Sequence, residues 1–162
     1  MPPPETRPGP ARSSFARDAI VLGLLGAVGP FAIDMYLPAM PTIAADLGAS
    51  IGATQMTLMA FFLAFGLCQI GYGPVSDMAG RRPPLFFGLG VFCVASIGCA
   101  LSRSIEWLIW LRLVQGLGAA WVMVVPRASI RDRYTGVEAT RMMALTMLVV
   151  SVAPMLAPLF GS

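Results

Sequence analysis

Hydrophobic residues fill five long stretches of the chain, and polar residues gather in the short segments between them. Each stretch runs for about 20 residues, the length that a helix needs to cross the hydrocarbon core of a bilayer. The second, third and fifth stretches contain no charged residue. The pattern therefore predicts an all-α integral membrane protein with five transmembrane helices. The predicted spans are 19–38, 53–75, 84–101, 107–126 and 142–161.

Residues 1–17 differ from the rest of the chain, because they are rich in Pro, Arg and Ser and hold almost nothing apolar to bury. We therefore expect a disordered tail, followed by a transmembrane bundle over residues 18–162. The first span is too long for a signal peptide, lacks an A-x-A cleavage site and precedes four further apolar segments, so it should stay in place.

The composition excludes most soluble functions. The 162 residues are 57% hydrophobic and 12% charged, with a mean hydropathy of +0.76, whereas soluble domains are about 45–50% apolar and about 25% charged. The chain has no histidine. Cys68, Cys93 and Cys99, interpreted as free core thiols, lack the spacing of a zinc or iron–sulfur motif. We expect no enzyme activity, no metal or other cofactor, and no nucleic-acid partner.

The arginines predict the orientation in the membrane. Nine of them lie in the tail and in the segments after spans 2 and 4, whereas Arg103 alone lies in the segments on the opposite side. Basic residues in short loops favour the cytoplasmic side, so the N-terminus should be cytoplasmic. The nine are Arg7, Arg12, Arg17, Arg81, Arg82, Arg127, Arg131, Arg133 and Arg141.

Small residues recur three or four positions apart within the spans. Gly23, Gly26 and Gly29 follow this spacing in the first span, and Gly116 and Ala120 follow it in the fourth. Such spacing lets helix backbones approach closely, which is how membrane helices associate without a hydrophobic driving force. We interpret these residues as packing positions.

Two ionisable residues, Asp34 and Arg112, lie inside spans. A charge at the centre of a membrane helix costs about 2.5–3.5 kcal/mol on insertion scales, so each requires a reason. At a rise of about 1.5 Å per residue the two lie at matching depth in the outer part of the bilayer, which permits an ion pair. Gln115, one turn from Arg112, and Tyr36 complete a candidate site for substrate or proton coupling. The alternative is a structural role, as a staple between two helices or as side chains that reach the interface.

The segment after the second span carries a motif. Gly80 permits a tight turn there, and Arg81 and Arg82 can anchor the chain at the interface. The segment resembles the signature between helices 2 and 3 of the major facilitator superfamily, G-x-x-x-D-x-x-G-R-[RK]. The resemblance implies that Asp77 and Arg81 belong to a latch that stabilises the outward-open state, while a simple turn and anchor remains the alternative. The matching residues are Gly73, Asp77, Gly80, Arg81 and Arg82.

Three further segments resemble motifs of the same superfamily. Span 4 is similar to the helix-4 motif, in which the resemblance implicates Arg112 in proton transfer. Residues 34–41, DMYLPAMP, resemble the outer end of helix 1 in drug:proton antiporters. The end of span 5 resembles the antiporter motif of helix 5, in which prolines kink the helix. The matching residues are Arg112, Gln115, Gly116, Gly118, Ala119 and Ala120 in span 4, and Pro154, Pro158 and Gly161 in span 5.

Together the motifs resemble the Bcr/CflA (bicyclomycin resistance) multidrug exporters. This implies two six-helix bundles with a cavity between them, of which the chain holds five helices of the incomplete N-terminal bundle. It also implies proton-coupled efflux of drugs or other small amphipathic compounds by alternating access in the bacterial inner membrane. The partners would be protons, a drug-like substrate, the lipid bilayer and the missing C-terminal half. A truncated membrane protein that transports nothing, and a sugar or metabolite carrier of the same superfamily, remain the alternatives.

Overall fold

The computed structural model describes residues 12–79 and 82–161, and in this part of the chain five α-helices account for almost every residue. Each helix contains a segment long and apolar enough to cross a membrane, as the hydropathy pattern predicts. The helices are α1 (Arg12–Asp46), α2 (Ile51–Ala79), α3 (Arg82–Ala100), α4 (Ile105–Arg133) and α5 (Gly136–Gly161).

Helix α1 extends beyond the predicted first span at both ends. It begins at Arg12, inside the segment expected to be a disordered tail, and ends at Asp46. The helix therefore begins before the expected boundary at residue 17, and its start packs against the end of α4: the Phe15 ring meets the Tyr134 ring edge-on, with centroids 5.5 Å apart. Hydropathy marks only the apolar part of a helix and misses such a polar extension. Residues 1–11 of the predicted tail lie outside the described residues.

Helix α4 is also longer than its predicted span of 107–126, and its polar ends explain why. The Ser104 hydroxyl accepts a hydrogen bond from the Trp107 backbone N–H and caps the first turn. Glu106 in the first turn and Arg131 and Arg133 in the last turn have the charges that the helix dipole favours at each end. These signals lie outside the apolar stretch and add turns to it.

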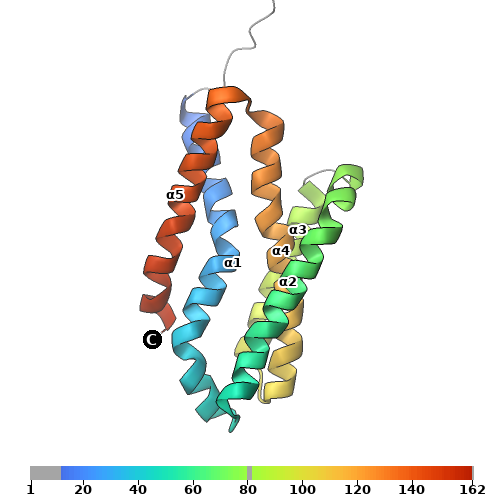
Figure 1. The fold of residues 1–162 in the computed structure, drawn as a ribbon, viewed down its shortest axis with the longest axis vertical. Helices are drawn as coiled ribbons and strands as arrows, with labels where there is room; N and C mark the ends of the chain where they lie inside the picture. The colour runs from blue at the N-terminus through green and yellow to red at the C-terminus, as the bar shows by residue number, and fades with distance from the viewer. Residues whose placement is uncertain (1–11, 80–81, 162) are drawn as a thin grey trace, which may run out of the picture.

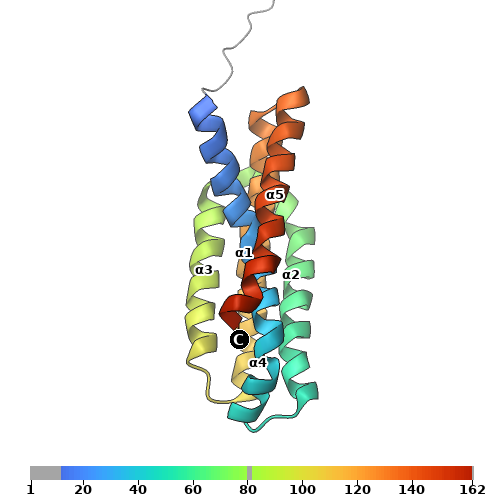
Figure 2. The same ribbon diagram turned by 90° about the vertical axis from the view of Figure 1, so that its left-hand side faces the viewer.

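The helices run alternately up and down, and α4 lies among the others (Figure 1). Helix α4 contacts all four other helices, whereas α2 and α3 hardly touch each other. Figure 2 shows α3 and α2 on opposite sides of the α1 and α5 pair. The start of α1, the end of α2 and the α4–α5 connection share one end of the bundle (Figure 1). Of the arginines predicted to be cytoplasmic, those in the described residues belong to segments at that end, and Arg7 and Arg81 lie outside the described residues.

Two glycines of α4 allow its neighbours to approach closely. A Cβ at Gly116 would collide with the backbone carbonyl of Phe61 on α2. A Cβ at Gly118 would come within 2.7 Å of the Phe92 backbone nitrogen and 2.8 Å of the Gly88 carbonyl oxygen on α3. These contacts confirm that Gly116 is a packing position, and they fix how α4 is rotated between α2 and α3.

The outer surface of the bundle is apolar. Large side chains such as Ile70, Val94 and Leu101 are exposed, as expected of a surface in contact with lipid. The interpretation of all three cysteines as core thiols is wrong for Cys93, which is exposed on α3, because lipid accepts a small thiol as readily as a protein core does. The five apolar helices and this surface make the chain a multi-pass membrane protein.

Candidate functional site

Arg112 of α4 is buried in the bundle and lies against the ring of Tyr36 on α1. The guanidinium carbon is 3.5 Å from the Tyr36 ring centroid and 5.9 Å from that of Phe61. Arg112 and Tyr36 are only 5% and 7% exposed. A guanidinium over an aromatic face gains cation–π energy, and the gain increases when water is excluded. This contact holds the charge of Arg112 between α1, α2 and α4.

Gln115 connects Arg112 to α3. Its side-chain oxygen accepts a hydrogen bond of 3.0 Å from Arg112 Nη1, and its Nε2 donates one of 2.7 Å to Ser96 Oγ. Ser96 in turn donates to the Phe92 carbonyl oxygen on its own helix at 2.7 Å. Arg112 and Gln115, predicted to lie one turn apart on one face, therefore do so. The amide orients the guanidinium and ties α4 to α3.

Tyr36 connects the same group to α2. Its hydroxyl is 2.5 Å from Thr57 Oγ1, and Thr57 Oγ1 donates to the Thr54 carbonyl oxygen at 2.6 Å. Thr54 and Thr57 are fully buried. Sequence reasoning missed Thr57 and Ser96, although Thr54 and Thr57 stand three positions apart in an apolar span and so share one helix face. Side chains from four helices thus form one polar cluster inside an apolar bundle.

Asp34 lies beside this cluster without joining it. It is half-buried on α1, and among the described residues no ion pair joins it to Arg112. The matching depth is correct, because Tyr36, two residues further along α1, contacts Arg112. Two residues of an α-helix correspond to about 200° of rotation, so Asp34 and Tyr36 leave the helix on nearly opposite sides. The ion pair that matching depth permits is therefore not formed.

A cavity of about 720 Å³ adjoins the cluster between α1, α3 and α4. Arg112, Gln115, Tyr36 and Ser96 line it together with apolar side chains. The cavity continues to Asp46 and Ser102, near the end of the bundle that carries the α1–α2 and α3–α4 connections (Figure 1). Its size is within the range of small-molecule sites, about 300–1,000 Å³. The apolar lining residues are Val28, Phe31, Ala32, Met35, Ala39, Ile43, Leu47, Phe92, Cys99, Ala100 and Leu108.

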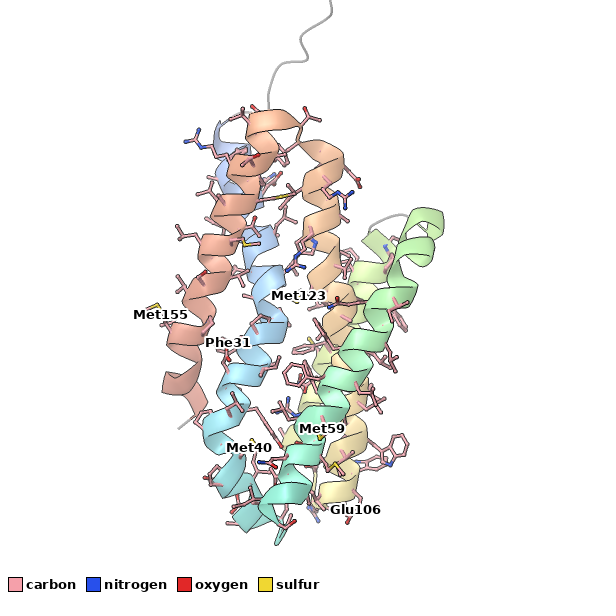
Figure 3. The ribbon with its side chains drawn as sticks, viewed as in Figure 1. Phe31, Met40, Met59, Glu106, Met123 and Met155 are labelled. Atoms are coloured by element: carbon pink, nitrogen blue, oxygen red, sulfur yellow. The ribbon has the colours of Figure 1, made fainter. Side chains whose placement is uncertain are left out.

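Met123 of α4 lies on the side of its helix toward α1 (Figure 3). A Cβ at Gly29 would be 3.7 Å from Met123 Sδ and 3.8 Å from a ring carbon of Phe65. At these distances a Cβ would make only ordinary van der Waals contact, so the close-packing role of Gly29 stays a prediction.

The remaining predicted site residues are described only in part. Gly73 and Asp77 lie on α2 and Arg82 begins α3, but the surroundings of these three residues, and all of Gly80 and Arg81, lie outside what the structure describes. Helix α5 continues past Pro154, which is exposed, through Pro158 to Gly161. The surroundings of Pro158 and Gly161 also lie outside what the structure describes. The latch and the proline motif therefore stay predictions.

A second group of polar contacts lies at the end of the bundle where α1 begins and α4 ends. Tyr134, just after α4, donates a hydrogen bond of 3.1 Å to Asp18 Oδ2 on α1, and Arg133 Nη1 lies 3.7 Å from the same oxygen. Burial raises the pKa of the Tyr134 hydroxyl above its usual value, and the hydrogen bond to Asp18 adds to the increase. Buried Ala19, Ile130 and Met142 pack around this contact. Sequence reasoning used Arg133 only to predict the orientation and did not predict this contact.

Comparisons with known proteins cover almost the whole bundle. A family model described as the Major Facilitator Superfamily matches residues 22–162. The chain is 43% identical over 143 residues to the uncharacterized MFS-type transporter YdgK of Bacillus subtilis. It is 36% identical over 142 residues to multidrug resistance protein D of Escherichia coli, and 34% identical over 152 residues to the chloramphenicol resistance protein of Pseudomonas aeruginosa. These alignments cover 88%, 88% and 93% of the chain but only 36% of each relative.

Proposed function

Because this chain belongs to the major facilitator superfamily, we propose that it forms the N-terminal part of a transporter that exports drugs or other small amphipathic compounds in exchange for protons. The names of two relatives, a multidrug resistance protein and a chloramphenicol resistance protein, support the substrate class. The chain spans 36% of the length of these relatives. The rest of the substrate cavity would therefore come from a C-terminal half.

The observation that carries the proposal is the buried position of Arg112. A guanidinium inside a membrane helix is costly, and such residues usually serve substrate or ion pathways. Here Tyr36 and Gln115 orient the guanidinium between helices that must move relative to other parts of a carrier during alternating access. A merely structural staple would not require the adjacent cavity of about 720 Å³.

Asp34 is the proton acceptor in this proposal. It is half-buried on the helix that also presents Tyr36 to Arg112. In this proposal a proton from outside neutralises Asp34 and so changes its electrostatic interaction with the charge of Arg112, with which it forms no ion pair in this structure. Proton binding would thereby shift the balance between outward-open and inward-open states. Asp77 and Arg81 would stabilise the outward-open state as a latch, and Pro154, Pro158 and Gly161 would bend α5.

The proposed location is the bacterial inner membrane, with a cytoplasmic N-terminus. The clustering of arginines in the segments at one end of the bundle supports this orientation. The end with Arg103 and the mouth of the cavity would then face outward.

Efflux from everted membrane vesicles tests the proposal. The complete transporter that carries these residues would be energised with a proton gradient, and accumulation of ethidium followed by fluorescence. We expect Asp34→Asn to abolish gradient-driven accumulation and the matched control Glu106→Gln to retain it, since Glu106 is exposed at the end of α4 away from the cluster (Figure 3). Wild-type accumulation by Asp34→Asn would refute proton coupling at Asp34.

Two further measurements separate the alternatives. Proteoliposomes that contain only the 162-residue chain should show no transport, because a single incomplete bundle supplies one wall of the cavity. Uptake of sugars or metabolites by the complete transporter, without export of any drug, would instead support the metabolite carrier.

A further inference from the structure

The start of α4 carries two tryptophans on the side of the helix that faces away from α1 and α2. Trp110 lies two positions before Arg112, which contacts α1, and two positions correspond to about 200° of rotation. Trp107 lies nine positions before Gly116, which contacts α2, and is therefore about 180° from it around the helix. The contacts that α4 makes with its neighbours thus direct both indoles outward, and they are 61% and 63% exposed.

These tryptophans stand next to a polar connection. Ser104 caps α4 through the backbone N–H of Trp107, and Arg103 and Glu106 are exposed on either side of the cap. An indole combines a large apolar ring with an N–H donor, and tryptophan is enriched where the hydrocarbon of a membrane meets the polar headgroups. The ester carbonyls of phospholipids lie at that boundary and accept hydrogen bonds. The chemistry of this end of α4 therefore fits the ester region of a bilayer.

The length of α4 between Trp107 and its first arginine beyond the apolar part agrees with this placement. Arg127 lies 20 positions after Trp107, which is about 30 Å along the helix. The hydrocarbon core of a bilayer is also about 30 Å thick. Arg127 is exposed, and arginines at the end of a span favour the headgroup region. The two boundaries of the hydrocarbon thus coincide with Trp107 and Arg127.

Helix α3 gives the same two boundaries independently. It begins at Arg82, and Ser102 follows 20 positions later, again about 30 Å. The Phe87 ring of α3 lies 6.2 Å from the Trp121 ring of α4, between centroids. Phe87 is about 8 Å from the level of Arg82, and Trp121 is about 9 Å from the level of Arg127.

A contact at the other end of α3 agrees as well. A Cβ at Gly98 would come within 2.8 Å of Leu111 Cδ2 on α4. Gly98 is about 6 Å from the level of Ser102, and Leu111 is about 6 Å from the level of Trp107. Side-chain contacts between α3 and α4 therefore align the polar ends of the two helices at both boundaries.

We propose that Trp107 and Trp110 form an interfacial anchor, in which their indole N–H groups donate hydrogen bonds to the ester carbonyls of phospholipids in the leaflet at the α3–α4 connection. Trp110, three positions deeper, lies within about 5 Å of the Trp107 level. The anchor fixes the depth of α4, so that the hydrocarbon extends from Trp107 to Arg127. It would hold the bundle at this depth whichever side of the membrane the connection faces.

Quenching of tryptophan fluorescence by brominated phosphatidylcholine tests this proposal. The full chain would be reconstituted in vesicles whose bromines lie either near the glycerol or near the end of the acyl chains. The chain has three tryptophans, so Trp121→Phe leaves only the anchor pair. The matched control is Trp107→Phe combined with Trp110→Phe, which leaves Trp121 deeper in the hydrocarbon. Circular dichroism would report the fold of each variant.

We expect bromines near the glycerol to quench the anchor pair more strongly than bromines near the chain ends, and Trp121 to show the reverse order. If Trp121→Phe fails to fold, comparison of the wild type with the double variant supplies the signal of the anchor pair. Equal or stronger quenching of the pair by bromines near the chain ends would overturn the proposal. Quenching of the pair by iodide in the water, as strong as that of free tryptophan, would likewise place it outside the lipid and overturn the proposal.

The complete transporter shows whether another segment of protein covers the indoles. Every tryptophan except Trp107 and Trp110 would be replaced by phenylalanine and the measurement repeated. Retention of the stronger quenching near the glycerol supports the anchor, and loss of lipid quenching would assign the indoles to a protein contact and refute it. The measurement requires neither a proton gradient nor ionisation of Asp34, so the proposed transport function would stand or fall separately.

Discussion

The Arg112 guanidinium lies over the Tyr36 ring, with its central carbon 3.5 Å from the ring centroid. This contact joins α4 to α1, and the Tyr36 hydroxyl extends it to Thr57 on α2. One aromatic residue thus takes the position next to the buried cation that a carboxylate could have filled.

Substitutions of Tyr36 should separate its two contacts. Tyr36→Phe keeps the aromatic face and loses the hydrogen bond to Thr57, so we expect a loss of about 0.6 kcal/mol in stability, the average for such bonds in a membrane protein. Tyr36→Leu also loses the cation–π contact and should lower the free energy of unfolding by about 0.5–2 kcal/mol more. Thermal unfolding in detergent, followed by circular dichroism, measures both. Equal stability of the Phe and Leu variants would contradict a cation–π contribution.

Gln115 and Ser96 should be energetically coupled across α4 and α3. Removal of either partner leaves the other without its hydrogen bond of 2.7 Å. In a double-mutant cycle of Gln115→Leu and Ser96→Ala we expect a coupling energy of about 0.6–1.7 kcal/mol. Unfolding of the four proteins under identical conditions supplies the cycle. Strict additivity of the two substitutions would show that the hydrogen bond contributes nothing.

Gly116→Val should disrupt the bundle, because its Cβ would meet the backbone of Phe61, which cannot move aside as a flexible side chain could. Overpacking costs about 1–3 kcal/mol or more. The matched control is Gly66→Val on α2, where an added Cβ meets nothing within 4 Å. Gel filtration and the midpoint of thermal unfolding compare the two variants. A control as unstable as Gly116→Val would point to loss of glycine in general and not to close packing.

The Tyr134 hydroxyl should titrate at higher pH than a free tyrosine, whose pKa is about 10. Its pKa is raised by burial first and then by Asp18. A pKa raised by folding means that the folded protein holds the proton more tightly, so this contribution to stability is present below about pH 10 and is lost as pH rises through the folded value. The absorbance of ionised tyrosine near 295 nm, compared between the wild type and Tyr134→Phe as pH is raised, measures the titration of this hydroxyl. We expect Asp18→Asn to move its titration to lower pH, and an unchanged curve would exclude a contribution from Asp18.

Hydropathy predicts the number and type of the helices well, because lipid requires about 20 apolar residues in each span. The helix ends were harder to predict. Arg12 lies in a polar segment that becomes helical through the contact of Phe15 with Tyr134, two residues far apart in the chain. The hydropathy of individual residues does not show which distant residues contact each other.

The candidate site could be predicted residue by residue but not contact by contact. The energetic cost of a buried charge identified Arg112, and helix periodicity placed Gln115 on the same face. Which residue of α1 faces Arg112 depends on how the helices are rotated, and close packing at Gly116 sets that rotation between α4 and α2. Ser96 was missed because a serine in a membrane helix often bonds only to its own backbone, as Ser151 does.

The contacts of α4 with every other helix have a consequence for biosynthesis. Helices emerge from the ribosome in chain order, and α2 hardly touches α3, so the first three helices have little to hold them together until α4 is inserted. During that interval the incomplete assembly would be exposed to membrane proteases and chaperones. Tyr36 of α1 and Ser96 of α3 would also lack their arginine and glutamine partners. The fourth helix is thus the step that commits the nascent chain to its native arrangement.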